Sequence, residues 1–153
     1  MTSLELKIPP LVLLVAFGMV AFALSLVIPS MTFTLAHSNV IAGALTVAGI
    51  GVALVGVIAF NRSGTTVNPT TPEKSLVVVS TGIYRFTRNP MYLGFALVLA
   101  GLATYLSNAA SLPMLPLFVG YMTKFQIKPE ERVLVEIFGA PFREYMATVR
   151  RWL

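Results

Sequence analysis

The chain has 153 residues, of which 56% are hydrophobic and only 11% charged, and its formal net charge is +5. This balance lies far outside the soluble globular average and predicts one integral membrane domain over residues 1–153. The absence of cysteine excludes disulfides and thiolate metal sites, and the single histidine excludes a histidine-cluster metal site. The basic residues gather in loops and at the tail, which favours anionic lipid over nucleic acid as a partner.

Two long apolar runs come first along the chain. Residues 9–28 end before Pro29, and residues 38–60 begin at Ser38, a plausible helix N-cap. Each run reaches the roughly 20 residues that are needed to cross the hydrocarbon core. The first run is too long for the core of a signal peptide, so we interpret it as a retained anchor. The sequence therefore predicts two anchoring transmembrane helices within residues 1–60.

A loop and two shorter apolar segments follow. Residues 61–80 carry turn-forming Gly, Pro and Ser and end in an apolar stretch at 76–79 of strand or helix-entry character, which predicts an ordered loop. Residues 91–106 and 113–127 are apolar, but at about 1.5 Å rise per residue neither comfortably covers a core about 30 Å thick. We therefore expect the polar clusters at the ends of this hairpin to lie inside the membrane boundary.

The tail carries a helical pattern. Beyond Pro129, apolar residues recur at three- and four-residue spacing and leave charged residues on the other face. Gly139-Ala140-Pro141 interrupts the pattern, so two helices that meet at a bend are expected. The predicted fold is all-α: an integral membrane helical bundle of about four transmembrane helices, with a C-terminal amphipathic helix at the interface. The apolar tail positions are Leu134, Val135, Phe138, Phe142, Tyr145, Met146 and Val149.

The basic residues predict the orientation. Apart from Lys7, every Lys and Arg lies in the link 61–89 or beyond residue 123, while the turns near Met31 and Ser107 carry none. The positive-inside rule then makes the chain a multi-pass protein with both termini in the cytoplasm. Two polar clusters, residues 82–92 and 128–132, would consequently lie on the same cytoplasmic side.

The first polar cluster contains a constrained turn. Pro90 favours an extended conformation for Asn89 and can begin a helix, so Arg88 and Asn89 project from a rigid turn. A bidentate guanidinium on such a turn suits a carboxylate. Alternatively, Arg88 anchors a helix end among lipid phosphates. Tyr84 and Tyr92 fit either an aromatic belt or π faces directed at a cation or an adenine ring.

The second polar cluster contains adjacent carboxylates, Glu130 and Glu131. They directly follow an apolar segment, repel each other, and belong to a set of only six acidic residues in the chain. A sulfonium or ammonium ligand, or an arginine such as Arg88 or Arg132, would relieve this repulsion. The alternative is that they are first-turn acids that favour a helix N-terminus after Pro129.

These motifs resemble the membrane methyltransferases that include the isoprenylcysteine carboxyl methyltransferases and the phospholipid N-methyltransferases. The resemblance covers roughly residues 64–153 and is specific in order and spacing. It rests on Gly82-x-Tyr84, Arg88-Asn89-Pro90-Met91-Tyr92-x-Gly94, Glu130-Glu131-x-x-Leu134, Phe138-Gly139, Tyr145 and Val149-x-Arg151.

The resemblance implies a helical bundle in which residues 61–153 enclose S-adenosylmethionine near the cytoplasmic face. Arg88, Glu130 and Glu131 match the family's catalytic and cofactor-contacting positions. The family often has histidine where this chain has Asn89, so a ring nitrogen is missing there. The predicted cofactor-binding residues are Gly82, Tyr84, Arg88, Asn89, Pro90, Tyr92, Glu130 and Glu131.

The predicted function is transfer of a methyl group from S-adenosylmethionine to a lipophilic acceptor that is either isoprenylcysteine carboxylate-like or phospholipid amine-like. Displacement at a sulfonium requires alignment and exclusion of water, and no metal. We expect one glutamate to contact the amino group of the cofactor, and the other to act as a base if the acceptor is a protonated amine. The alternative is a non-enzymatic membrane scaffold or transporter-like bundle that binds anionic lipid, which predicts no affinity for S-adenosylmethionine.

Overall fold

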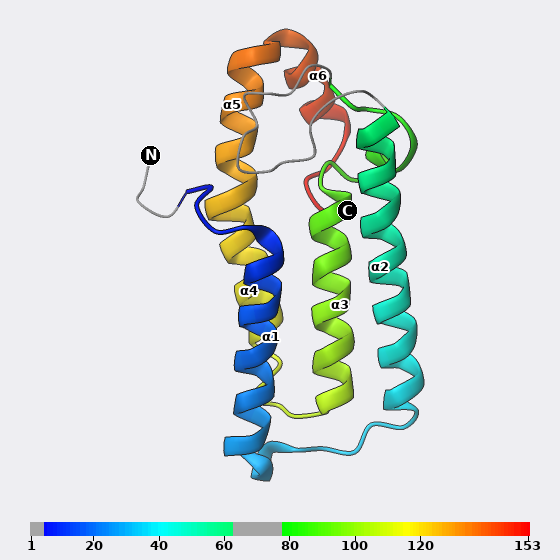
Figure 1. Ribbon diagram of the computed structural model, residues 1–153, viewed down its shortest axis with the longest axis vertical. Helices are drawn as coiled ribbons and strands as arrows, with labels where there is room; N and C mark the ends of the chain where they lie inside the picture. The colour runs from blue at the N-terminus through cyan, green and yellow to red at the C-terminus, as the bar shows by residue number, and fades with distance from the viewer. Residues whose placement is uncertain (1–4, 63–77) are drawn as a thin grey trace.

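The structure is a computed structural model that describes residues 5–62 and 78–153. Within these ranges every regular element is helical, and the single β contact is an isolated bridge between Thr32 and Asn108 (Figure 1). The all-α prediction is therefore confirmed for the described residues. The loop predicted at 61–80 falls mostly on residues 63–77, which lie outside the described residues.

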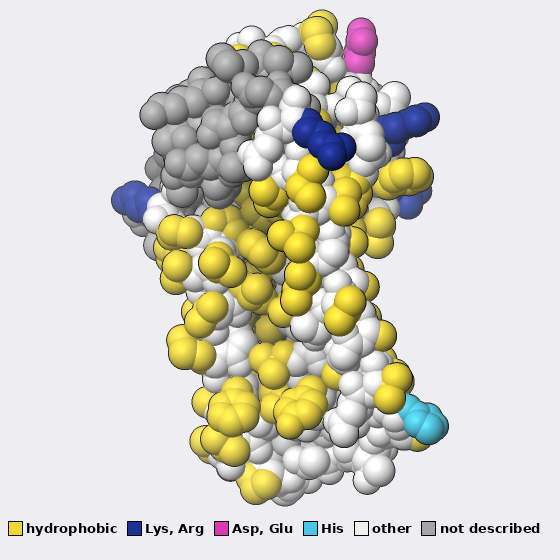
Figure 2. All heavy atoms as spheres, turned by 45° about the vertical axis from the view of Figure 1, so that its right-hand side comes forward, with side chains coloured by type: hydrophobic (Ala, Val, Ile, Leu, Met, Phe, Trp, Pro, Cys, Tyr) yellow, Lys and Arg dark blue, Asp and Glu magenta, His cyan; other side chains and the backbone are white. Residues whose placement is uncertain are grey.

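The first two helices follow the two long apolar runs. Helix α1 spans Pro10–Val27 and α2 spans Ser38–Arg62, and both are long and apolar enough to cross a membrane. Pro10 occupies the first turn of α1, where its missing N–H costs no hydrogen bond. Large apolar side chains along both helices are exposed, and Figure 2 shows hydrophobic side chains over most of one face with charged ones toward one end. Such a surface suits hydrocarbon, and the count of four spans stays a prediction.

Helix α3, Pro90–Leu106, packs closely against α2. A Cβ built on Gly49 of α2 would lie 2.6 Å from the carbonyl oxygen of Gly94, so no larger side chain fits without moving the backbone. Small residues at this crossing let the two helices approach backbone to backbone. The contact fixes the start of α3, and with it the turn at residues 87–89.

The fourth apolar segment does not end at Ile127 as the sequence suggested. Helix α4, Met114–Met122, continues through a π-helical turn, η4, at Thr123–Ile127 into α5, Lys128–Phe138 (Figure 1). Pro129 has no N–H to offer the Phe125 carbonyl one turn earlier, and its ring would crowd that carbonyl in a regular α-helix. The wider π turn accommodates the ring, and the Leu6 N–H donates to Phe125 O at 3.1 Å instead.

The tail divides at Gly139, as predicted. Gly139 has φ +62° and ψ −127°, a conformation that is essentially confined to glycine, and it separates α5 from α6, Ala140–Thr148. The bend between two helices is therefore confirmed, whereas the interfacial position of an amphipathic tail helix stays a prediction. Figure 1 places α5, α6, the end of α2 and the start of α3 at the same end of the molecule.

Candidate functional site

The turn before α3 is held by its own hydrogen bonds and by the C-terminal segment. The Asn89 N–H donates to Thr87 Oγ1 at 3.2 Å, and Asn89 Nδ2 donates to the Arg151 carbonyl at 2.9 Å. Pro90, fully buried, begins α3 immediately afterwards. The amide of Asn89, at the position where the resembling family often has histidine, thus joins the turn to the C-terminal segment.

Arg88 and Glu131 form an ion pair, although 43 positions separate them in the sequence. Arg88 Nη2 lies 2.8 Å from Glu131 Oε1, and both side chains are mostly buried, at 9% and 12% exposed. The Arg88 Nη1 donates to the Met146 carbonyl at 3.0 Å, while Nε is buried without a partner among the described residues. Burial lowers the pKa of Arg88, whereas the charge of Glu131 raises it. The two predicted polar clusters therefore meet.

A second arginine completes this cluster. Arg151 Nη2 lies 2.6 Å from Glu131 Oε2, and its Nε donates to Oε1 at 3.0 Å. This bidentate geometry is the strong form of an arginine–carboxylate contact. The hydrogen bonds to Glu131 raise the pKa of Arg151. Two guanidinium groups share one carboxylate, so the group of three, the Arg88–Glu131–Arg151 cluster, carries a net positive charge.

Glu130 has a separate environment. Tyr92, buried in the first turns of α3, donates its hydroxyl to Glu130 Oε1 at 2.5 Å. Burial raises the pKa of Glu130 to about 8, and the charge of Glu131 acts in the same direction, while the Tyr92 hydrogen bond lowers it. The two adjacent glutamates are thereby differentiated, because one is paired with cations and the other is poised near neutral pH.

Tyr84 lies in the short 3₁₀-helix η3, Gly82–Arg85, and is only 3% exposed. Its ring meets Phe60 edge-on at 5.2 Å, and its carbonyl accepts a hydrogen bond from the Tyr145 hydroxyl at 2.7 Å. The Tyr84 hydroxyl is buried and has no partner in residues 5–62 and 78–153, and burial raises its pKa, so it is a protonated donor. Burial of Tyr84 and Tyr92 disfavours the aromatic-belt interpretation of both.

The predicted residues divide into two groups. In the first group the side chains contact each other: Arg88 pairs with Glu131, and Tyr92 bonds to Glu130. In the second group the residues shape the backbone: Gly82, with φ +60°, begins η3. Asn89 and Pro90 shape the turn. None of the described residues forms a group of His, Cys, Asp or Glu that could hold a metal ion.

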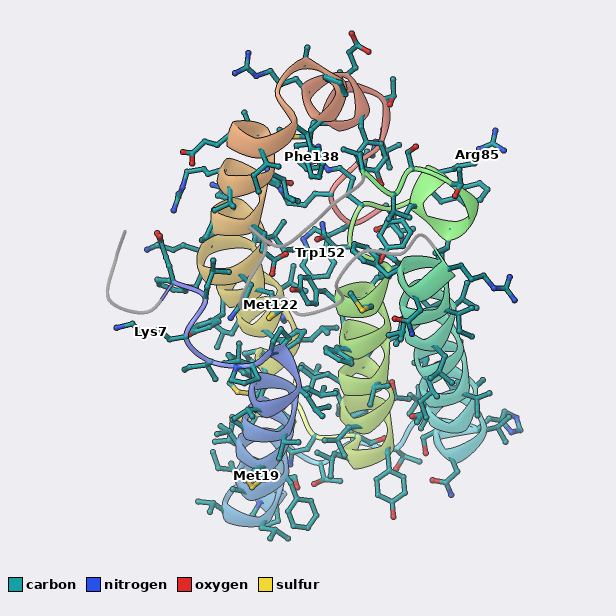
Figure 3. The ribbon with its side chains drawn as sticks, turned by 45° about the horizontal axis from the view of Figure 1, so that its top comes forward. Lys7, Met19, Arg85, Met122, Phe138 and Trp152 are labelled. Atoms are coloured by element: carbon teal, nitrogen blue, oxygen red, sulfur yellow. The ribbon has the colours of Figure 1, made fainter. Side chains whose placement is uncertain are left out.

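Sequence reasoning missed two contributions of the C-terminal segment. Arg151 was visible only as part of the closing motif and received no role, because nothing in the sequence shows that the tail folds back. Trp152 is partly buried, and its Nε1 donates to Thr123 Oγ1 at 3.1 Å. Figure 3 shows Trp152 between α3 and the α4–α5 helix.

The arrangement suits a ligand that carries both signs of charge. The net positive Arg88–Glu131–Arg151 cluster can take a carboxylate, and the glutamates can take an ammonium or a sulfonium. The unpartnered Arg88 Nε and Tyr84 hydroxyl are additional buried donors that a ligand could satisfy.

Comparisons with known proteins bear on the same part of the chain. The sequence model of the phospholipid methyltransferase family matches residues 37–141. The protein-S-isoprenylcysteine O-methyltransferase of Saccharomyces cerevisiae is 38% identical over 79 residues, which are 50% of this chain and 32% of that protein. The enzyme of the same name from Schizosaccharomyces pombe is 31% identical over 77 residues, 50% of this chain and 33% of that protein.

A shorter relative is matched along its whole length. An uncharacterised protein of Haemophilus influenzae is 36% identical over 63 residues, which are 41% of this chain and 100% of that protein. The chain thus spans about a third of each of the two yeast proteins that it matches. No solved structure matches the chain.

Proposed function

Because the chain belongs to the phospholipid methyltransferase family, we propose that it transfers a methyl group from S-adenosylmethionine to a lipophilic acceptor in a membrane. The observation that carries the proposal is the Arg88–Glu131–Arg151 cluster, which joins α3, α5 and the C-terminal segment around buried charge. Charged groups are costly beside a bilayer unless they are paired or bind something. The motif resemblance itself is confirmed by the family match.

The donor set fits S-adenosylmethionine. Its amino acid moiety carries a carboxylate and an ammonium, which the two arginines and Glu131 would hold, and Arg88 Nε is a buried donor still unused. When bound, this cofactor supplies a methyl group that is already activated on a sulfonium. The proposed pocket consists of Gly82, Tyr84, Arg88, Asn89, Pro90, Tyr92, Glu130 and Glu131, with Arg151 added on the geometry above.

The chain's own residues then have three tasks. The rigid turn at residues 87–89 positions Arg88, and the apolar packing around Tyr92 excludes water from the reacting groups. Glu130, with its pKa of about 8, is the better placed of the two glutamates to remove a proton from an amine acceptor near neutral pH. A carboxylate acceptor would need no base.

The proposed topology is that residues 1–60 anchor the protein and residues 61–153 form the site. The apolar surface of α1 and α2 supports a multi-pass membrane protein, and we place both termini in the cytoplasm because the basic residues gather at the site end. Acceptors that are isoprenylcysteine carboxylate-like or phospholipid amine-like would both enter from the lipid.

Calorimetry with S-adenosylmethionine in detergent tests the proposal, followed by a labelled-methyl transfer screen over both acceptor classes. We expect binding by the wild type and a loss of about tenfold or more in Arg88→Gln, which removes a charge-assisted contact. Arg143→Gln, at an exposed position on α6, is the matched control and should bind normally. Absence of binding by the wild type would instead favour the scaffold that binds anionic lipid.

A further inference from the structure

Gln126 is a fully buried polar residue with an unused hydrogen-bond acceptor. Its Nε2 donates to the Ile8 carbonyl at 2.7 Å, whereas its Oε1 has no partner among the described residues. Rotating the side-chain amide by 180° would not give Oε1 a donor, because Oε1 would then face the Ile8 carbonyl oxygen. A buried acceptor without a donor is costly and calls for an explanation.

The π-helical turn η4 brings Gln126 close to the candidate site. Gln126 precedes Glu130 by one helical turn on a continuous helix, and η4 packs into the same apolar cluster as Tyr92. Two further buried polar atoms lack partners in the described chain, the hydroxyl of Tyr84 and Nε of Arg88, and both belong to residues of the candidate site. Buried polar atoms without partners are expected where a ligand completes the hydrogen bonding, and π-helical turns are frequent at functional sites.

Gln126 Oε1 determines which kind of ligand group could bind to it. An amide oxygen accepts a hydrogen bond from an N–H or O–H and repels a carboxylate. Glu130, one turn farther along the helix, also presents acceptor oxygens, so this stretch favours a group rich in N–H donors. Gln126 lies nearer than Glu130 to the apolar helix α4, where the lipophilic acceptor would lie in preference to the charged cofactor.

We propose that Gln126 Oε1 accepts a hydrogen bond from the amine headgroup of the methyl acceptor and makes the site selective for amine-bearing over carboxylate-bearing lipids. The inference rests on the proposed function for the presence of an acceptor at this position. It assigns Gln126 a binding role, separate from proton transfer.

A binding measurement tests the role without turnover. Trp152 is the only tryptophan, and it donates to Thr123 at the start of η4, so its fluorescence reports on this turn. Dodecylamine and dodecyltrimethylammonium, titrated into the protein in lipid nanodiscs, have the same charge and chain, but only the first has N–H groups. The wild type should bind the amine about tenfold more tightly, as one buried hydrogen bond predicts, and dodecanoate more weakly still.

Two variants separate binding from a merely structural role. Gln126→Leu should lose the preference for the amine, whereas Gln126→Glu keeps an oxygen acceptor and should retain it, although it also loses the donor to Ile8. A structural role through Ile8 predicts equal loss in both variants. Equal or undetectable binding of the two probes by the wild type, or a preference that survives in Gln126→Leu, would overturn the proposal.

Calorimetry on the same proteins keeps the two proposals apart. If the wild type fails to bind S-adenosylmethionine, the proposed function fails while the probe preference still measures Gln126. If Gln126→Leu weakens cofactor binding and leaves the amine preference intact, the free oxygen belongs to the cofactor site, and the assignment to the acceptor is wrong.

Discussion

Glu131→Gln should destabilise the protein more than any other single change of a carboxylate to an amide. Glu131 accepts three hydrogen bonds from Arg88 and Arg151, and the variant leaves two guanidinium groups facing each other without a counter-charge. Removing one partner of a buried ion pair costs about 3–5 kcal/mol. Arg151 is 32% exposed, so water screens part of its charge, and we expect the free energy of unfolding to fall by about 3 kcal/mol.

Reversible unfolding in mixed micelles, followed by circular dichroism, measures this difference. Glu136→Gln is the matched control, because it makes the same chemical change at an exposed position of the same helix and should stay within about 0.5 kcal/mol of the wild type. Glu131→Gln/Arg151→Gln should recover part of the loss, since it removes one of the two repelling cations. If Glu131→Gln unfolds like Glu136→Gln, the cluster does not hold the elements together and our reasoning fails.

Three further predictions address the rest of the structure. The folded-state pKa of Glu130, about 8, lies above its ordinary value of 4.5. The contribution of Glu130 to stability is therefore fully present below pH 4.5 and is lost as the pH rises through 8. The free energy of unfolding, measured over this pH range, should fall less steeply in Glu130→Gln than in the wild type. Tyr92→Phe removes the hydrogen bond that lowers this pKa, so the midpoint of the same titration should move to higher pH, with a loss of about 1–2 kcal/mol in stability; an unchanged midpoint would contradict the contact. Gly94→Ala should lower the free energy of unfolding by about 1–3 kcal/mol in the same assay, because the added methyl group meets the backbone of α2. Gly51→Ala has open space around the added methyl group and should not destabilise the protein. Equal effects of the two substitutions would show that α2 and α3 are not closely packed.

The starts of the first three long helices were predictable from the sequence. The starts of α1 and α3 at Pro10 and Pro90, and the start of α2 at Ser38, lie within a residue of their predicted positions. Local residues determine these boundaries, so local reasoning finds them. The bend at Gly139 was predictable for the same reason.

The remainder depended on contacts between distant parts of the chain. A helix that continues through Pro129 was not predictable, because the compensating donor is the amide of Leu6. The pairing of Arg88 with Glu131 was one of several ways to relieve the adjacent carboxylates, and the sequence left the choice open. Arg151 as a second partner depends on the tail folding back onto α5, which no periodicity reports.

The bond from the Leu6 amide to the Phe125 carbonyl has a consequence for biosynthesis. The ribosome makes the helix containing Phe125 long after it has made Leu6, so this hydrogen bond forms only once that helix has been synthesised. The contact of Leu6 with this helix therefore joins the start of α1 to a part of the bundle that is made only after α1, α2 and α3.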